Sequence, residues 1–326
     1  METTMRAVRH DRFGPPEVLE IERITVPRPG PGQVLVRVHA ASVSGGETAI
    51  REGRLRRVMR SKPPRGIGVD FSGRVVGVGT GVSPEQVGRE VWGLMPHMAF
   101  GSTAEYVAVP VGRVAPAPRG LDPIRAAALP ATGTTVLTAL VEKARLAEGE
   151  RLLVRGASGG VGSAAVEVGR ALGAHVTGLA GARNLDWVRE LGAHEALDHR
   201  RTGPEDLGRF DVVLDVVGTR LESYRRLLGP GGRMLPLAMD TSRPLRSAAY
   251  VLWSAVAHRR QVLPFSNDPS PETLAELTRY VESGRLTPHV DEVFPMSRIR
   301  DAHHRMERGG VRGKLVVSMA EDAATG

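Results

Sequence analysis

A glycine-rich segment offers the clearest chemistry in this sequence: Gly156-Ala157-Ser158-Gly159-Gly160-Val161-Gly162. The apolar run RLLVRG leads into it, and SAAVEVGRALGA, which has helical spacing, follows it. Glycine permits a tight turn and the close approach of a diphosphate, whose charge then lies at the N-terminus of the helix. If Gly159 and Gly162 are the second and third glycines of the dinucleotide fingerprint, Ala157 takes the first position. The segment therefore predicts a dinucleotide-binding loop between a strand and a helix.

The residues about 20 positions further on indicate which dinucleotide this loop would bind. An acid at the end of the second strand would accept a hydrogen bond from the ribose 2′-hydroxyl of NAD. The chain has no acid there, since it reads Gly178-Leu179-Ala180-Gly181-Ala182-Arg183-Asn184. Arg183 stands where a 2′-phosphate needs a cation, which favours NADPH over NADH. The alternative is that Arg183 only marks the start of a solvated helix.

Part of the same segment fits a different reaction. Gly156-Ala157-Ser158-Gly159-Gly160 matches the G-x-S-x-G turn that carries the nucleophilic serine of many hydrolases. Asp215 and His289 follow it in the order that such enzymes use. A hydrolase has no use for Gly162 or Arg183, however, and no HGGG-type segment precedes the serine. A serine hydrolase that uses Ser158 stays open as an alternative, and the dinucleotide interpretation is favoured.

The elements around the loop indicate an α/β fold. From Arg151 onward, strand-like and helix-like runs alternate, which is typical of βαβ units and a doubly wound parallel sheet. The expected strands are RLLVRG, HVTGLAG, DVVLDVVG, RMLPLA and QVLPF, and the expected helices include LDWVRELGA, ESYRRLLGPG and PETLAELTRYVESG. The first third has short Val-rich runs divided by Gly and Pro, which predicts a compact, mostly antiparallel β domain. Between the two parts, Asp122 is expected to cap a helix that begins at Pro123.

Composition limits the class of protein. The 326 residues suggest about two domains. The absence of cysteine excludes disulfides and cysteine-ligated zinc. The chain has no run of about 20 apolar residues and no apolar signal core, so we expect a cytoplasmic protein without a membrane partner. The net charge is +8, and the chain has one dense basic cluster, residues 51–65. No aromatic residue lies within this cluster to stack on bases, so we expect no nucleic-acid partner.

Taken together, the motifs resemble those of the zinc-free branch of the medium-chain dehydrogenase/reductase superfamily, the quinone oxidoreductase group. The matching motifs, in order, are AASVSGGETAIREG, GVDFSGRVVGVGTGV, AEYVAVP, LPATGTTVLTAL, the glycine-rich segment, DVVLDVVG and VRGKLVV. The resemblance implies a GroES-like, mostly β catalytic domain from residues 1–118 and 286–326, and a Rossmann domain from residues 119–285. It also implies a substrate cleft between the domains, NADPH as the cofactor, and a homodimer joined through Rossmann edge strands.

The resemblance also assigns candidate site residues. Those expected to bind the cofactor are Thr135, Ser158, Gly159, Gly160, Val161, Gly162, Arg183, Asn184, His199, Val217, Gly218 and Phe265. Phe265 is expected on a strand that faces the carboxamide, and Arg183, Asn184 and His199 at the adenosine phosphate. Ser44 and Glu47 are expected to border the substrate cleft, where the family commonly has an asparagine and an aspartate.

No zinc site is expected. Zinc alcohol dehydrogenases have a cysteine about where Ser44 stands, and a His-Glu pair where Val69 and Asp70 stand. The histidines elsewhere do not replace these ligands: His303 and His304, for example, lie on a late predicted helix, where packed or solvated imidazoles are the ordinary interpretation.

The expected reaction is the NADPH-dependent reduction of a quinone, or of the activated double bond of an enone or enoyl substrate. Negative charge then develops on the substrate's carbonyl oxygen, so the protein has to supply hydrogen-bond donors and exclude water. Ser44 and Thr135 are the candidate catalytic donors, and no side chain stands out as a proton donor. Two alternatives stay open: reductive tailoring or cyclisation of a natural-product intermediate, and a regulatory protein that only binds NADPH. If residues 51–65 form a flap over the cleft, Arg56 and Arg57 would recognise a substrate held on an acidic phosphopantetheine carrier.

Overall fold

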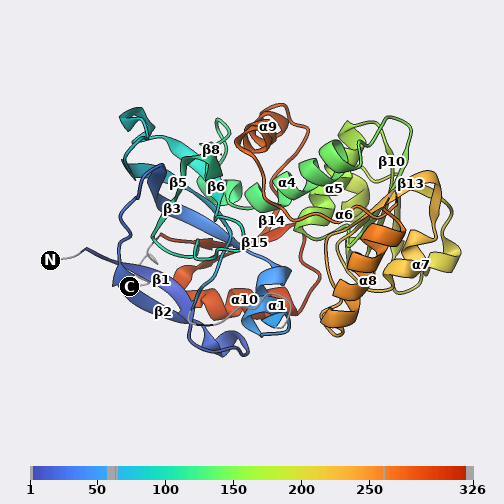
Figure 1. Ribbon diagram of the computed structural model, residues 1–326, viewed down its shortest axis with the longest axis horizontal. Coiled ribbons are helices and arrows are strands. Elements are labelled where there is room, and N and C mark those ends of the chain that lie inside the picture. The colour runs from blue at the N-terminus through green and yellow to red at the C-terminus, as the bar shows by residue number, and fades with distance from the viewer. Residues whose placement is uncertain (1–2, 57–62, 64, 260, 321–326) are drawn as a thin grey trace.

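Figure 1 shows two sheet-containing regions side by side, one built from the two ends of the chain and the other from its middle. The computed structural model describes residues 3–56, 63, 65–259 and 261–320. None of the helices within those ranges combines the length and the apolar character that crossing a membrane requires.

The first region is rich in β-structure. Its strands are β1 (Thr4–His10), β2 (Glu20–Thr25), β3 (Gln33–Val43), β4 (Arg65–Gly66), β5 (Asp70–Val78), β6 (Glu90–Leu94), β7 (Tyr106–Pro110), β8 (Val114–Pro116), β14 (Val290–Pro295) and β15 (Lys314–Ser318). One sheet has the order β2-β1-β4, and the larger one has the order β14-β15-β3-β5-β6-β8, with β7 paired to β3. The last strand lies antiparallel to β3, with Leu315 opposite Val43, so the two chain ends share a sheet. Helices α1 (Gly45–Arg51) and α10 (Ile299–Glu307) pack against each other beside this sheet.

The second region is a five-stranded parallel sheet with the order β11-β10-β9-β12-β13. Its strands are β9 (Arg151–Arg155), β10 (His175–Ala180), β11 (Glu195–Asp198), β12 (Phe210–Asp215) and β13 (Leu228–Pro236). Its helices are α4 (Pro130–Val136), α5 (Gly160–Ala171), α6 (Leu185–Glu190), α7 (Leu221–Arg225), α8 (Pro244–Ala257) and α9 (Pro271–Glu282). Helix α3 (Pro123–Ala126), which precedes them, packs on β3, β5 and β15 of the first region. The chain runs outward from β9 to β11 and then returns to β12 on the other side of β9. Ligands of such sheets bind at the carboxyl ends of the strands where the order reverses, here between β9 and β12.

Short helical turns complete the described chain. They are η1 (Pro16–Val18), η2 (Pro84–Gln86), η3 (Val111–Arg113), η5 (Ala182–Asn184), η6 (Pro204–Asp206), η7 (Met296–Arg298) and a π-helical stretch, η4 (Leu137–Lys143), that continues α4. The predicted cap of α3 is confirmed, because the carboxylate of Asp122 accepts the N–H of Arg125 at 3.0 Å and Pro123 is the first helical residue.

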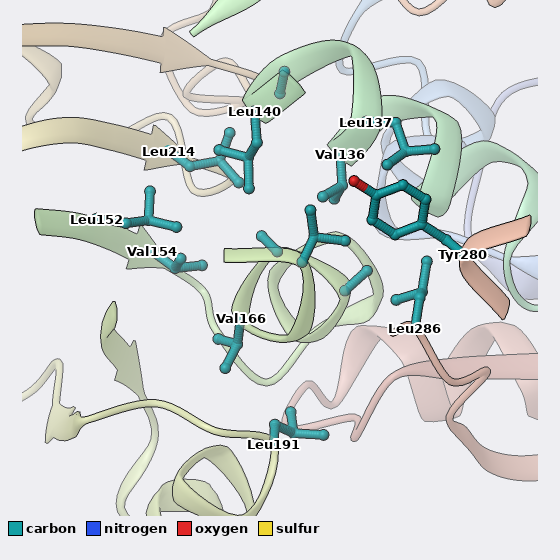
Figure 2. Close-up of a cluster of buried hydrophobic side chains, with 14 of the residues drawn as sticks. Val136, Leu137, Leu140, Leu152, Val154, Val166, Leu191, Leu214, Tyr280 and Leu286 are labelled. Atoms are coloured by element: carbon teal, nitrogen blue, oxygen red, sulfur yellow. The ribbon is translucent and has the colours of Figure 1, made fainter. Parts of the chain in front are cut away.

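The largest hydrophobic core surrounds α5 and β9 (Figure 2). Leu152 and Val154 of β9, Val166 of α5 and Leu214 of β12 are completely buried, and Tyr280 of α9 covers one side. Burying each such aliphatic side chain stabilises the fold by about 1.5–3 kcal/mol. The loop that joins β9 to α5 is therefore anchored at both ends in the best-packed part of the protein.

The predicted architecture, a mostly β part together with a doubly wound parallel sheet, is confirmed, with local differences. QVLPF does not form a strand: Val262 makes one isolated bridge to Met234, and Pro264 lacks the N–H that would extend the pairing. Strand β11 and helix α8 are not evident from the sequence, since β11 has four residues, two of them acidic, and no side chain caps α8. The domain boundaries, residues 1–118 with 286–326 and residues 119–285, stay a prediction.

Candidate active site

The glycine-rich loop connects the end of β9 to the start of α5. Gly156 has a φ of +79°, which a residue with a Cβ rarely adopts, and its N–H donates to the carbonyl of Leu179 at 3.0 Å. Gly159 is the N-cap of α5, and a Cβ on Gly162 would lie 2.0 Å from the carbonyl oxygen of Gly156. The start of the loop thus packs on the first turn of α5 without space for a side chain at Gly162. The first N–H groups of this helix have no partner within the helix, which makes a cradle for an anion.

A second loop follows β12 and lies beside the first. Asp215, which is fully buried, shapes it by accepting the N–H groups of Val217 at 2.9 Å and Gly218 at 2.7 Å. Arg155, at the end of β9, pairs with the same carboxylate and donates to the carbonyl of Thr219 at 2.8 Å. The buried charges of Arg155 and Asp215 compensate each other, so the pair joins the ends of the two strands where the sheet order reverses.

Two cavities meet at these loops. The arginine-rich cavity, of about 840 Å³, is lined by Gly156, Ser158 and the residues that follow β10. The cleft, of about 790 Å³, is lined by Gly159 and the first turn of α5 together with α1 and α4. Val217 and Thr219 line both cavities. One elongated ligand can therefore span them, with its centre at the N-terminus of α5.

The arginine-rich cavity collects the residues predicted for the adenosine phosphate. The side chains around it include Ser158, Arg183, Asn184, His199, Arg200, Arg220 and Arg308. Arg183 is exposed, and its Nη2 donates to the carbonyl of Gly309 at 2.8 Å. Arg200, Arg220 and Arg308 were not singled out from the sequence, because they come from three separate segments that only the fold brings together.

Asn184 lines the same cavity but is already bonded to the protein. Its side chain is buried, its amide oxygen accepts from Arg312 at 3.0 Å, and its amide nitrogen lies 3.4 Å from the carbonyl oxygen of Gly310. The N–H of Gly313 donates to the carbonyl of Ser158 at 2.9 Å. These contacts bind the segment after α10 against the glycine-rich loop, so Asn184 holds the cavity wall in place.

The cleft brings together most residues predicted around the nicotinamide. Ser44, Thr135, Val161, Val217 and Phe265 line it. The Oγ of Ser44 accepts the N–H of Glu47 at 3.3 Å as the N-cap of α1, and its hydroxyl proton remains available for donation. Phe265 reaches the cleft from irregular backbone rather than from the expected strand. Gly218 lines neither cavity; its φ of +84° shapes the loop instead.

Lys314 is a cleft residue that the sequence motifs did not single out. Its side chain packs over the start of α5, where a Cβ on Gly160 would lie 2.7 Å from the Lys314 Cδ. The Nζ of Lys314 lies 3.3 Å from Asp70, and both side chains are buried. Asp70 also accepts hydrogen bonds from Ser42 and from the N–H of Ala131. The basic residue inside the apolar run VRGKLVV was the available signal.

The donor set in this region does not fit zinc. Ser44 offers a neutral hydroxyl and Val69 no ligand, whereas zinc sites use thiolate, imidazole and carboxylate. Asp70 already neutralises Lys314. Within the described ranges, no group of three His, Cys, Asp or Glu side chains is placed to hold a metal ion.

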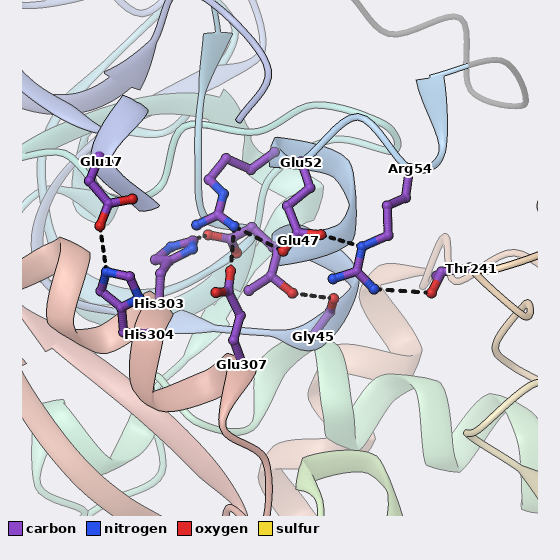
Figure 3. Close-up of polar contacts among 11 residues, drawn as sticks. Glu17, Gly45, Glu47, Glu52, Arg54, Thr241, His303, His304 and Glu307 are labelled. Carbon is purple, nitrogen blue, oxygen red and sulfur yellow. Dashed lines mark hydrogen bonds and ion pairs between the residues drawn. The ribbon is translucent and has the colours of Figure 1, made fainter. Parts of the chain in front are cut away.

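Glu47 does not line the cleft, which corrects the prediction for this residue. Its side chain is 3% exposed, and its Oε1 lies 3.5 Å from the Nε2 of the fully buried His303 on α10. Figure 3 shows Glu47, His303 and Glu307 grouped between α1 and α10. The side chain lies one turn after Ser44, on the face of α1 that packs against α10. Glu47 thus belongs to the packing behind the cleft wall.

The basic cluster of residues 51–65 is not uniformly exposed. Arg51 is fully buried, pairs with Glu307, and lies 3.2 Å from Glu52. Arg51 therefore cannot belong to a flap over the cleft. Arg56 is exposed, whereas Arg57, the other arginine expected to act there, lies outside the described residues.

The structure gives Ser158 no triad. Asp215 pairs with Arg155, and the Nε2 of His289 lies 3.2 Å from Glu167. In the part of the chain that the structure describes, no hydrogen bond links Ser158 to His289, or His289 to Asp215. The acid and the histidine that a hydrolase would need therefore both contact other residues.

Comparison with known proteins agrees with this geometry. A family model described as an alcohol dehydrogenase GroES-like domain matches residues 30–119, and one described as a zinc-binding dehydrogenase matches residues 191–317. The chain is 32% identical to the mitochondrial NAD(P)H oxidoreductase RTN4IP1 of Mus musculus, over 97% of this chain and 90% of that protein. It is 31% identical to the chloroplastic NADPH-dependent alkenal/one oxidoreductase of Arabidopsis thaliana, over 96% and 79%. The solved quinone oxidoreductase of Coxiella burnetii is 27% identical, with a TM-score of 0.86 over 98% of this chain and all of the other.

The parallel sheet with its glycine-rich loop, the GroES-like β region and the cleft beside them define the protein as an oxidoreductase with a dehydrogenase fold. The chain belongs to the medium-chain dehydrogenase/reductase superfamily, in the quinone oxidoreductase group.

Proposed function

We propose that the protein is an NADPH-dependent reductase that delivers hydride, without zinc, to a quinone or to the activated double bond of an enone or enoyl substrate. The main support is the pair of cavities that meet at the N-terminus of α5. A dinucleotide matches this arrangement, with its diphosphate on the free N–H groups of the helix and one half in each cavity. The mouse and Arabidopsis relatives, named NAD(P)H and NADPH-dependent oxidoreductases, support the same cofactor class.

The preference for the phosphorylated dinucleotide is supported by charge. Arg183, Arg200, Arg220 and Arg308 line the arginine-rich cavity, and its lining contains no acidic side chain among the described residues. An arginine binds phosphate through several N–H donors at once. NADH lacks the phosphate that these side chains would bind.

The chain's own residues would orient the substrate and protect the reaction. When bound, the nicotinamide supplies the hydride. The hydroxyls of Ser44 and Thr135 would donate to the carbonyl oxygen on which negative charge develops. The buried ion pair of Lys314 and Asp70 holds the cleft wall beside them. Val161 and Phe265 provide apolar walls that exclude water. Solvent supplies the proton.

Calorimetry with NADPH and with NADH, followed by a screen of quinones and enones, tests this proposal. Tight NADPH binding together with substrate-dependent oxidation is the expected result. NADPH binding without reduction of any acceptor would instead favour a regulatory protein, and covalent labelling of Ser158 by a serine-reactive phosphonate would favour a hydrolase. Reduction confined to complex natural-product intermediates would identify a tailoring enzyme.

We also propose that the protein works in the cytoplasm as a homodimer joined through the open β13 edge of the parallel sheet. The single bridge of Val262 leaves most backbone groups on that edge without a strand partner among the described residues. Sedimentation of the purified chain tests the dimer.

A further inference from the structure

Helix α8 presents a row of large apolar side chains to solvent. Leu245 is 56% exposed, Leu252 71%, Trp253 56% and Val256 79%. Positions separated by seven, eight and eleven residues lie on one side of an α-helix, so these four side chains form a single face, which we call the α8 face. Figure 1 shows α8 at the outside of the parallel-sheet region. Contiguous exposed apolar side chains of this size indicate an interaction site.

The opposite side of α8 faces the protein and is only partly apolar, since Tyr250 and Val251 pack against a hydrophobic core there. Ser247 and Ser254 are buried, and the hydroxyl of Tyr250 donates to Glu222 at 2.7 Å. A surface helix of a globular protein normally turns its apolar side inward and its polar side outward. Packing of α8 on the chain's own core does not account for the four exposed apolar side chains, whereas an apolar partner outside the protein would.

The charges around the α8 face select the kind of partner. Residues 242–260 read SRPLRSAAYVLWSAVAHRR, which contains four arginines and no acid. Arg243, Arg246 and Arg259 are exposed at the two ends of the helix. Two copies of this face would bring these like charges together, which is unfavourable. An anionic surface would attract them.

A cavity beside the start of α8 adds to this positive charge. It measures about 480 Å³ and is lined by Arg54, Arg56, Arg243 and Arg246. The acid in its lining, Glu52, is already paired with Arg54. The cavity therefore offers more positive charge than its lining neutralises, next to the apolar side chains of the α8 face.

We propose that α8 docks the protein onto an anionic lipid bilayer. Leu245, Leu252, Trp253 and Val256 enter the interface, and the flanking arginines contact lipid phosphates, as in amphipathic helices that lie in the plane of a membrane. This revises the expectation that no membrane is a partner, which rested on the lack of a spanning segment. Val251 of the same helix lines the cleft. Docking thus places the cleft close to a phase in which apolar acceptors dissolve.

Co-sedimentation of the full chain with lipid vesicles tests the docking, and it needs neither dinucleotide nor substrate. Vesicles of phosphatidylcholine with phosphatidylglycerol are expected to bind the protein, and pure phosphatidylcholine vesicles and high salt to release it. The double variant Leu252→Glu/Val256→Glu should bind at least tenfold more weakly. Val87→Glu is the matched control, because Val87 is 48% exposed in the β-rich region, and it should bind like the unmodified chain.

Tryptophan fluorescence gives a second readout that needs no variant. Trp253 is 56% exposed, whereas Trp92 is fully buried and Trp187 packs, partly buried, against the largest core. Transfer of Trp253 into the interface should therefore shift the emission to shorter wavelengths. The proposal is overturned if anionic vesicles neither bind the chain nor shift its emission. It is also overturned if the chain is a dimer that the double variant dissociates, since a second copy would then cover the α8 face.

Discussion

Replacing Arg183 with glutamine tests whether the arginine-rich cavity recognises the phosphate of NADPH. A guanidinium has five N–H donors, and Arg183 uses one nitrogen, Nη2, for the carbonyl of Gly309 at 2.8 Å. The remaining donors are available to a phosphate in the cavity that the side chain lines. A hydrogen bond to a charged group contributes about 1.5–3 kcal/mol, which is about 10- to 150-fold in affinity. Because Arg183 is exposed, we expect the lower end, about tenfold weaker NADPH binding.

Calorimetry with both dinucleotides measures this change. Arg183→Gln should weaken NADPH binding about tenfold and leave NADH binding unchanged. Arg189→Gln is the matched control, since Arg189 lies on α6, pairs with Asp186 and lines neither cavity. Equal weakening of both dinucleotides would refute the reasoning, because Arg183 would then act only by holding Gly309. Unchanged binding of both would refute it as well.

Three further changes test other parts of the site. Gly162→Ala should lower the free energy of unfolding by about 1–3 kcal/mol and abolish dinucleotide binding, because the new Cβ would meet backbone atoms. Thermal melts and calorimetry measure the two effects. Gly229→Ala is the control, since its Cβ would meet an oxygen only at 3.7 Å, and it should change stability and binding little. Arg225 and two other hydrogen-bond donors lower the pKa of Glu222 from 4.5 to about 2, so it stabilises the fold above pH 4.5 and loses this effect as the pH falls towards 2. Glu222→Gln should flatten that part of the stability profile in denaturant unfolding, and an unchanged slope would contradict the assignment. Ser44→Ala should lower kcat for a quinone about 100-fold if the hydroxyl binds the carbonyl oxygen, and an unchanged kcat would exclude that role. Separately, the loss of the N-cap should lower the free energy of unfolding by about 1 kcal/mol.

Local sequence signals were sufficient for the framework of the site. The glycine-rich segment, its strand and its helix follow from residue types that have few alternative conformations, such as Gly156 at positive φ. Asp122 before Pro123 fixed the start of α3 in the same way. The family motif DVVLDVVG then placed Val217 next to the loop. Such features depend on residues that are close in the sequence, so they can be predicted from one sequence alone.

Features that depend on distant partners could not be predicted in this way. Glu47 was assigned to the cleft by its position in the motif, but contact between α1 and α10 turns it towards His303. Lys314 reaches the start of α5 because β15 pairs with β3, more than 200 residues away in the sequence. The exposed face of α8 is likewise visible only once the other side of the helix is found packed against Glu222 and a hydrophobic core. Sequence spacing alone does not indicate which face of a short helix is covered.

The most direct test of the reductase is the near-ultraviolet absorbance of NADPH mixed with the protein and 1,4-naphthoquinone. The site described here predicts that the absorbance falls in proportion to the quinone supplied, and that Gly162→Ala, while still folded, stops the reaction. If NADPH binds but its absorbance stays constant with every quinone and enone, or if the Gly162 variant reduces the quinone as fast as the unmodified chain, the loop is not the site of the reaction.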